Sequence, residues 1–231
     1  VTLSNPNDQL TLATRTDVVT AADGTEHTMT YDATTRTITR TSPGGRQTHT
    51  VLDELGHVTQ TRVPGLASTH FAYDGRGLLT SVSTGEGPDA RRTTATYNDQ
   101  GLLASITDPA GRVTSYTYDA AGRVLNKTLP DMASISFSYD ANANLTSLTP
   151  PERPAHGFAY DPRDLPSRYD PPSLGPADWS TSVAFNRDRQ PTSITLPGPQ
   201  VIESTYDPAG RLASTRSPRR GATGAGAGGR A

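Results

Sequence analysis

The sequence repeats itself with a period of 21 residues, and this periodicity limits the fold more than any other feature. One unit is YDAAGRVLNKTLPDMASISFSYD, from Tyr118 to Asp140, where the closing Tyr-Asp begins the next unit. We call the first position of each unit the anchor. The anchors are Tyr31, Leu52, Tyr73, Tyr97, Tyr118, Tyr139, Tyr160, Phe185 and Tyr206. Six of the eight intervals between them are 21 residues and the others are 24 and 25, so the chain is predicted to be an array of one structural unit.

An acidic or amide residue follows every anchor, and Gly often stands four residues after it. The clearest examples of this pair are Asp74 with Gly77, Asp119 with Gly122, and Asp207 with Gly210; Gly101 follows Asn98 in the same way. The Asp carboxylate can accept a hydrogen bond from a nearby backbone N–H, and Gly supplies the positive φ that a short bulged hairpin needs. Asp-x-x-Gly is therefore expected to be a tight turn.

Apolar residues stand six residues after most anchors and two residues before them. Positions two apart lie on one face of a strand, so these residues predict a buried face. A second Pro- or Gly-rich break follows, as at Pro64-Gly65, so each unit is predicted to be an antiparallel β-hairpin with strands of roughly six residues. We assign all but one of the fourteen aromatic residues to repeat positions, the exception being Trp179. A single hairpin is not stable in water, so neighbouring hairpins must share edges.

Units such as YDGRGLL, YDAAGRV and YDPAGRL, each followed by a Pro/Gly turn, resemble the YD repeats of Rhs proteins. Similar repeats occur in bacterial toxin-complex proteins, WapA-like cell-wall proteins and teneurins. The resemblance covers about residues 28–215 and implies an all-β fold of about nine hairpins in a curved, spiralling sheet that is part of a hollow YD shell. It implies as partners the remaining YD repeats and a C-terminal toxin cargo, and a bacterial, secreted or cell-surface location for the full-length protein.

Composition excludes several other classes. Hydrophobic residues make up only 32% of the chain, which suits a thin sheet better than a thick core. The net charge of −2 does not indicate nucleic-acid binding, and no apolar run is long enough to span a membrane. There is no Cys, so no disulfide or thiolate chemistry is available. The chain opens Val1-Thr2-Leu3 without a Met or signal peptide, which indicates an internal fragment of a longer protein.

The array is predicted to have three parts. Residues 1–27 are a lead-in with a degraded repeat around Asn5 and Leu10, residues 28–216 are the array, and residues 217–231 are a Gly/Ala-rich tail expected to be disordered. Residues 83–92 and 168–180 are expected to be loop insertions. Pro166 and Pro191 replace the apolar residue six positions after the anchor, so in those two units the ladder position is expected to be unpaired or the strand to bulge. The abrupt end of the repeats suggests a frameshift or a truncation.

No motif for chemistry is present. The five His residues have no metal-ligand spacing, and no GxSxG motif or Gly-rich phosphate loop occurs. His27 and His156 lie four residues before an anchor and are expected on the same face as the aromatic residues. The Asp residues recur because the turn recurs. We therefore expect no catalytic, cofactor-binding or metal-binding residue, and the anchors and turn residues are structural.

Two functions remain open. The first is a non-enzymatic piece of a shell that encloses and helps deliver a C-terminal toxin or effector domain, and we favour it. The alternative is an extracellular carbohydrate-binding or cell-adhesion scaffold with a sugar or cell-surface receptor as partner, for which only Trp179 is an unassigned aromatic residue. About eighteen strands spaced roughly 4.8 Å apart make a ribbon about 86 Å around. That ribbon is too small to enclose a domain, so the chain would be an incomplete part of a shell.

Overall fold

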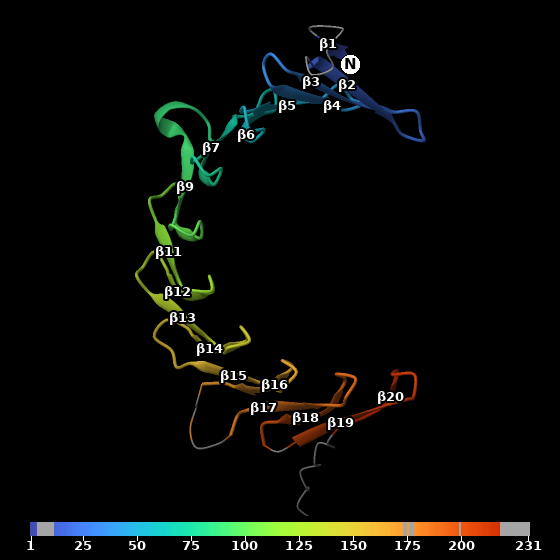
Figure 1. Cartoon of the computed structure of the whole chain (residues 1–231), viewed down its shortest axis with the longest axis vertical. Helices are drawn as coiled ribbons and strands as arrows, with labels where there is room; N and C mark the ends of the chain where they lie inside the picture. The colour runs from blue at the N-terminus through green and yellow to red at the C-terminus, as the bar shows by residue number, and fades with distance from the viewer. Residues whose placement is uncertain (4–11, 173–174, 176–177, 199, 218–231) are drawn as a thin grey trace, which may run out of the picture. The chain divides into compact units, whose positions relative to one another are not determined.

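A computed structural model of the whole chain describes residues 1–3, 12–172, 175, 178–198 and 200–217. Two compact units divide the chain, residues 1–116 and residues 117–231. The N-terminal unit contains ten complete strands and most of an eleventh (Figure 1). They are β1 (Thr2–Leu3), β2 (Leu12–Thr20), β3 (Glu26–Asp32), β4 (Thr37–Thr41), β5 (Gln47–Leu52), β6 (Val58–Arg62), β7 (Thr69–Tyr73), β8 (Leu79–Thr84), β9 (Arg91–Tyr97), β10 (Leu103–Thr107) and β11 (Val113–Tyr118).

The C-terminal unit begins within β11 and contains nine further strands. They are β12 (Val124–Thr128), β13 (Ser134–Tyr139), β14 (Leu145–Thr149), β15 (His156–Tyr160), β16 (Pro166–Asp170), β17 (Thr181–Phe185), β18 (Pro191–Leu196), β19 (Gln200–Tyr206) and β20 (Leu212–Arg216). A single 3₁₀ turn, Gly87–Asp89, is the only helix among the described residues.

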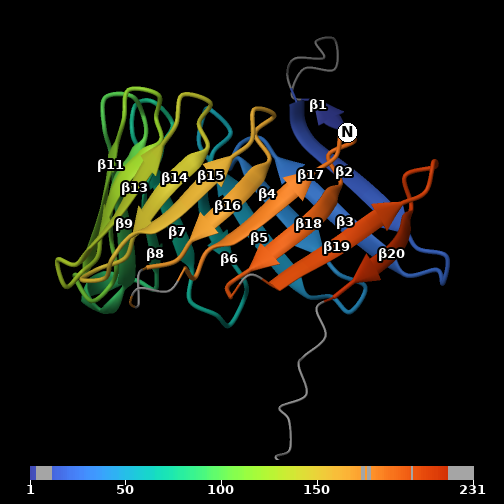
Figure 2. The ribbon, with the colours of Figure 1, turned by 90° about the horizontal axis from the view of Figure 1, so that it is seen from below.

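Within each unit, strands that follow one another in the sequence pair with one another in antiparallel fashion. In the N-terminal unit, β2 pairs with β3, β3 with β4, and so on to β10 with β11. The same order runs from β12 to β20 in the C-terminal unit. Turns therefore gather at both ends of the strands (Figure 2). The prediction of an all-β array of antiparallel hairpins is confirmed.

The pairing begins earlier in the chain than the repeat pattern indicated. β2 pairs with β3 over seven residues, from Thr14 opposite Asp32 to Thr20 opposite Glu26, around the turn at Asp23-Gly24. Part of residues 1–27 is thus a regular hairpin partner. The expected degraded repeat around Asn5 and Leu10 and most of the expected C-terminal tail lie outside the described residues.

Both expected insertions are shorter than the sequence suggested. β8 continues to Thr84 and β9 begins at Arg91, so only the six residues between them are loop, and Ser83 is buried. β16 continues to Asp170, with Tyr169 paired to Phe158. The loops were predicted to be too long because their ends are polar, and an exposed hairpin strand can be as polar as a loop.

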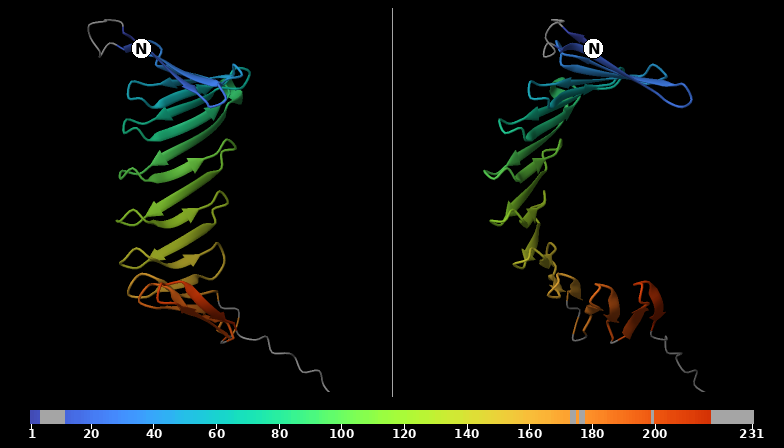
Figure 3. Two further views of the ribbon diagram at one scale, coloured as in Figure 1. Left: turned by 90° about the vertical axis from the view of Figure 1, so that its right-hand side faces the viewer. Right: turned by 45° about the vertical axis from the view of Figure 1, so that its right-hand side comes forward.

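The face that carries the anchors, here called the aromatic face, is half-buried, and the prediction of a buried core was wrong. All nine anchors are partly exposed, and no hydrophobic side chain is fully buried in the described residues. The described strands of each unit form a single layer (Figure 3). Burial on this face comes only from neighbouring strands, because no second layer of described residues covers it.

A β-bulge follows the anchor in most repeats. Tyr73 is opposite Leu79 whereas Ala72 is opposite Ser81, so Thr80 is the extra residue. The same shift occurs with and without Pro six residues after the anchor, so Pro166 and Pro191 are not its cause. The hydroxyl of Thr80 donates to the Ala72 carbonyl at 3.1 Å, which gives the bulge a partner across the hairpin.

Candidate functional site

The turn after each anchor, here called the anchor turn, has the most regular polar geometry in the molecule. At the turn between β7 and β8, the Asp74 N–H donates to the Leu78 carbonyl at 2.9 Å, and the Gly77 N–H donates to the Asp74 carbonyl at 2.9 Å. In the turn after Tyr118, the Asp119 N–H donates to the Arg123 carbonyl and the Gly122 N–H to the Asp119 carbonyl, and the turn after Tyr206 has the same two bonds. Eight of the nine anchor turns therefore close the same five-residue loop, whereas Asp32, in the turn after Tyr31, pairs directly with Thr37.

The Asp side chain accepts hydrogen bonds from backbone N–H groups of its own anchor turn. One Asp74 carboxylate oxygen accepts the backbone N–H groups of Arg76 and Leu78, both at 2.9 Å. The Asn98 amide oxygen accepts the Leu102 N–H at 2.9 Å in the next repeat, so an amide serves in place of a carboxylate. These bonds satisfy N–H groups that the tight loop keeps out of the β-ladder.

The second carboxylate oxygen of several anchor turns binds an arginine of the same turn. The Arg123 side chain donates to Asp119 at 2.6 Å. The backbone N–H of Arg123, and then its side chain, hold the pKa of Asp119 below its ordinary value of 3.8, although desolvation opposes them. The pKa of Asp74 is lowered in the same way, first by the N–H of Leu78. These carboxylates are thus ionised acceptors that are already occupied, which leaves them poorly placed to act as general bases.

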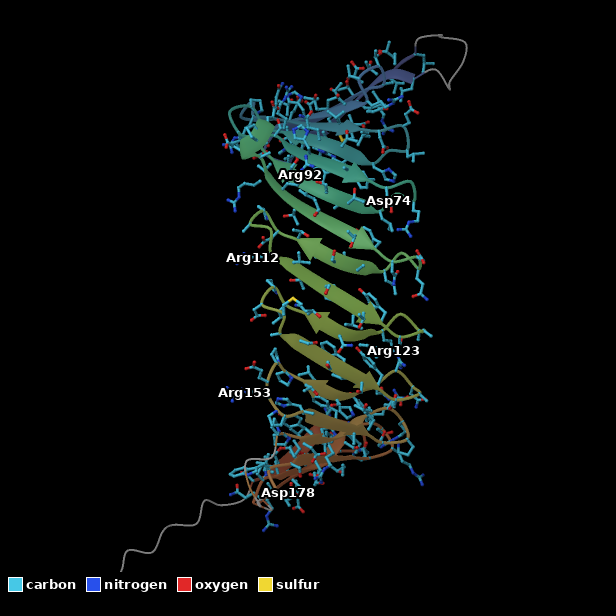
Figure 4. The ribbon with its side chains drawn as sticks, turned by 90° about the vertical axis from the view of Figure 1, so that its left-hand side faces the viewer. Asp74, Arg92, Arg112, Arg123, Arg153 and Asp178 are labelled. Carbon is cyan, nitrogen blue, oxygen red and sulfur yellow. The ribbon has the colours of Figure 1, made fainter. Side chains whose placement is uncertain are left out.

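Arginine and amide side chains also join several anchor turns to the next one along the edge. Arg76 donates to the Asn98 carbonyl at 3.1 Å, and Arg123 donates to the Asp140 carbonyl at 2.9 Å. Gln190 donates to the Gly210 carbonyl at 2.6 Å. Figure 4 shows Asp74 and Arg112 at opposite ends of the strands of the N-terminal unit, and Arg123 and Arg153 at opposite ends in the C-terminal unit. The anchor turns of each unit therefore lie at one end of the strands, and several neighbouring turns are joined by hydrogen bonds.

The anchor tyrosines link consecutive hairpins by their hydroxyl groups. Tyr73 donates to the Val58 carbonyl at 2.9 Å, Tyr97 to the Leu79 carbonyl at 2.7 Å, and Tyr206 to the Pro191 carbonyl at 3.0 Å. Each acceptor is the residue six positions after the preceding anchor. The predicted anchors Tyr31, Tyr73, Tyr97, Tyr118, Tyr139, Tyr160, Phe185 and Tyr206 all lie partly exposed at strand ends, each beside its turn.

Glycine fills the left-handed position of only some anchor turns. Gly77, Gly101, Gly122 and Gly210 have φ values of 79°, 80°, 80° and 78°, as their spacing predicts. In the following repeats the same position is held by Ala143, Asp164 and Arg189, which also have positive φ. The turn geometry therefore persists without glycine.

Two side-chain groups were missed from the sequence. His57 takes the place that Arg123 has in its own turn, bonds to Asp53 at 2.9 Å through Nδ1, and stacks on Tyr73 with ring centroids 4.8 Å apart. Tyr169 stacks between two neighbours on the aromatic face, with its hydroxyl 2.7 Å from His156 Nδ1 and its ring 5.5 Å from Phe158. The spacing of both groups was available: His57 is five residues after its anchor, and Tyr169 is nine residues after Tyr160.

The geometry of these groups is that of a scaffold. In the described part of the chain, no group of three or more His, Cys, Asp or Glu side chains is placed to hold a metal ion. The described residues also contain no helix long and apolar enough to cross a membrane. The anchor-turn side chains described above bond to backbone or side-chain groups of their own or the next turn.

Comparison with known proteins agrees with this repeat geometry. The family described as teneurin YD-shell matches residues 13–220, which is most of the chain. The chain belongs to the teneurin YD-shell family. The match includes every anchor and both expected insertions. No curated protein matches this YD-shell chain.

Solved structures show the same fold at low sequence identity. A crystal structure titled TcdB2-TccC3-Cdc42 matches 87% of this YD-shell chain with 16% identity and a TM-score of 0.65. A second, titled TcdB2-TccC3, also matches 87% with 16% identity and has a TM-score of 0.61. The chain covers 13% of each of those chains. At this identity the likeness concerns the fold alone.

Proposed function

We propose that this chain is a non-enzymatic structural part of a YD shell that encloses and helps deliver a C-terminal toxin or effector domain. The cargo and the remaining repeats belong to the full-length protein, which we place outside the cell or at its surface. The array occupies residues 28–216 with its hairpin partner β2, and the anchor and turn residues are its structural elements.

The observation that carries this proposal is which groups the polar side chains of the anchor turns bond to. Carboxylate and guanidinium groups of the anchor turns bond to groups of their own or the next turn, as in Arg123 with the Asp119 carboxylate and the Asp140 carbonyl. An enzyme would need some of these groups directed to a substrate. A structural sheet needs its polar groups to bond neighbouring turns along the sheet, and the groups of the anchor turns do so.

The first test is the sequence of the coding DNA for several kilobases on both sides, translated in all frames. Further YD units followed by an unrelated C-terminal domain are expected. An export signal with adhesion modules on one side and a native stop codon after Ala231 would contradict the shell and favour a surface scaffold.

A second test uses the full-length protein and limited proteolysis. An enclosed domain should resist a protease until the shell is opened, so its cleavage should follow the unfolding of the YD repeats in a urea series. Variants in which an anchor is replaced, such as Tyr97→Ala, should expose the domain at lower urea. Cleavage of the domain at the same rate with the repeats folded and unfolded would overturn enclosure.

One observation favours the carbohydrate-binding alternative. Trp179 is 46% exposed and lines a hollow with Leu196, Pro197 and Gly198, near the carboxylate of Asp178. An exposed indole beside a carboxylate is suited to stacking on a sugar ring. Because Trp179 is the only Trp, its fluorescence should change when an oligosaccharide binds, and a series of cell-wall oligosaccharides without any such change would remove the alternative.

A further inference from the structure

A hollow in the N-terminal unit has a composition that the scaffold does not require. It lies over β2, β3, β4 and β5, which Figure 1 labels near the start of the chain, and its volume is about 410 Å³. Asp17, Met29, Arg40 and Thr48 form a row across these four strands, since each is the direct cross-strand partner of the next. Val19 and His27 are also direct cross-strand partners, two residues along β2 and β3 from Asp17 and Met29. The strand register itself therefore fixes which side chains line the hollow.

The hollow carries more positive than negative charge. Arg40 reaches it from β4 and Arg46 from the turn between β4 and β5. Both are exposed, and neither has an ion pair with another described residue. The one acidic residue of the lining, Asp17, is already paired with Arg15 at 3.0 Å. Two guanidinium groups therefore remain without a counter-charge in one concave place.

This arrangement contrasts with the arginines of the anchor turns. Arg76, Arg123, Arg163 and Arg211 each bind the Asp of their own turn, at 2.6–3.1 Å. Arg40 stands nine residues after its anchor, a position that is apolar or aromatic in five of the nine repeats, Thr in two and basic in two, the other basic residue being Lys127. Arg40 therefore places a fixed positive charge on the aromatic face, at a position where five of the nine repeats have an apolar or aromatic residue.

We propose that this hollow binds a tetrahedral oxyanion, phosphate or sulfate, between Arg40 and Arg46. The planar guanidinium presents a fork of donors that matches phosphate and sulfate oxygens, and charge-assisted bonds of this kind are stronger than neutral ones. His27 also lines the hollow. Val19 and Met29 supply an apolar contact that free phosphate cannot use and that the organic part of a phosphate ester can.

The test is a titration of the whole chain with inorganic phosphate, followed by NMR at the arginine Nε–H groups and the backbone amides of β4 and β5. Saturable shifts at Arg40 and Arg46 are expected, with a dissociation constant on the order of millimolar because both groups are exposed. Binding should weaken as sodium chloride is raised, since salt screens exposed charges.

Matched variants separate this site from general positive charge. Arg40→Gln and Arg46→Gln should each raise the dissociation constant about ten-fold, as expected for loss of one charge-assisted contact. Arg62→Gln is the control: Arg62 is exposed on β6, has no ion pair with a described residue, and faces away from the hollow through its pairing with His49. It should change the constant less than two-fold.

A parallel titration with glucose 6-phosphate distinguishes the source of the oxyanion. Tighter binding than inorganic phosphate, lost on Val19→Ser, would identify an ester as the ligand; equal binding would identify the free ion. Shifts that do not saturate by tens of millimolar, or an effect of Arg62→Gln equal to that of Arg40→Gln, would overturn the site. Thermal melts of each variant confirm that the sheet is folded during the titration.

Discussion

Two neighbouring anchor turns of the C-terminal unit differ at the residue whose backbone is left-handed. The turn after Tyr118 has Gly122 with φ of 80°, and the turn after Tyr139 has Ala143 with φ of 68°. Their hydrogen bonds are otherwise alike: Asp119 accepts the N–H of Ala121 and Arg123, and Asp140 accepts the N–H of the equivalent residues. The geometry therefore survives the loss of the residue that best suits it.

The φ values show how the turn adapts. Among the eight anchor turns with the five-residue loop, the five glycines have φ from 78° to 86°, whereas the three residues that replace glycine have φ of 68°, 61° and 64°. Side-chain-bearing residues have their left-handed minimum near 57°, so the substituted turns have moved toward it. The Asp carboxylate and the hairpin register hold the loop closed, and glycine sets only how strained it is.

Acid is expected to lower the free energy of unfolding more than any single substitution, because it protonates the Asp carboxylates of several anchor turns together. The pKa of Asp119 is lowered, first by the N–H of Arg123, and the pKa of Asp140 is lowered, first by the side chain of Asn144. A carboxyl with a lower pKa in the folded state stabilises the fold above its unfolded value and loses that contribution as pH falls through the folded value. Urea melts should show stability falling steeply once the pH drops below 3.8.

The turns with Asn provide an internal control for the acid prediction. Asn98 and Asn186 make the same bonds to the N–H groups of Leu102 and Gln190 but cannot titrate. Hydrogen exchange below the ordinary carboxyl pKa should accelerate at the Arg123 amide more than at the Leu102 amide. Equal acceleration would show that the carboxylates are not what closes the turns.

Anchors precede the turns with glycine and the turns without it. Removing an anchor side chain should therefore lower the free energy of unfolding more than replacing a turn glycine. Tyr97 is half-buried and its hydroxyl donates to the Leu79 carbonyl at 2.7 Å. Tyr97→Ala should lower the free energy of unfolding by about 2–3 kcal/mol, below the value for a fully buried aromatic residue. Tyr97→Phe isolates the hydrogen bond and should cost about 1 kcal/mol. Trp179→Ala should cost less than about 1 kcal/mol; a cost equal to that of Tyr97→Ala would place the main packing contacts elsewhere.

What the sequence could predict depends on how local each interaction is. Asp74 and Gly77 were predictable because a turn carboxylate and a positive φ act within five residues, and the structure has both. The bulge at Thr80 was not, because it depends on register against Ala72 across the hairpin. The expected buried face is only half-buried, because full burial depends on a second layer that the repeat pattern cannot report. Arg40 and Arg46 line the same hollow because of how β2 to β5 pair, so no local sequence motif could have predicted this hollow.

Replacing glycine in an anchor turn should have a moderate cost. Gly56 has φ of 86°, and a Cβ added there would meet no atom within 4 Å. Gly56→Ala should therefore destabilise through backbone strain alone, by about 1 kcal/mol, after the smaller entropy of the unfolded Ala chain offsets part of the strain. Urea melts at neutral pH measure the change. No loss of stability would mean that the glycine turns relax as freely as the substituted ones, and the difference in φ would then have no energetic meaning.

The smallest effect is expected from the reverse change, Ala143→Gly. Ala143 has φ of 68°, closer to the left-handed minimum than Gly56, so less strain is available for release. Stability should rise by about 0.5 kcal/mol, since the added entropy of the unfolded glycine opposes the relief of strain. Ala121→Gly is the matched control: Ala121 lies in the neighbouring anchor turn and does not have positive φ, so the same substitution should destabilise by about 0.5–1 kcal/mol. Opposite signs for the two alanines would establish that the substituted turns store strain, whereas a loss of stability at both positions would show that the loop around Ala143 carries none.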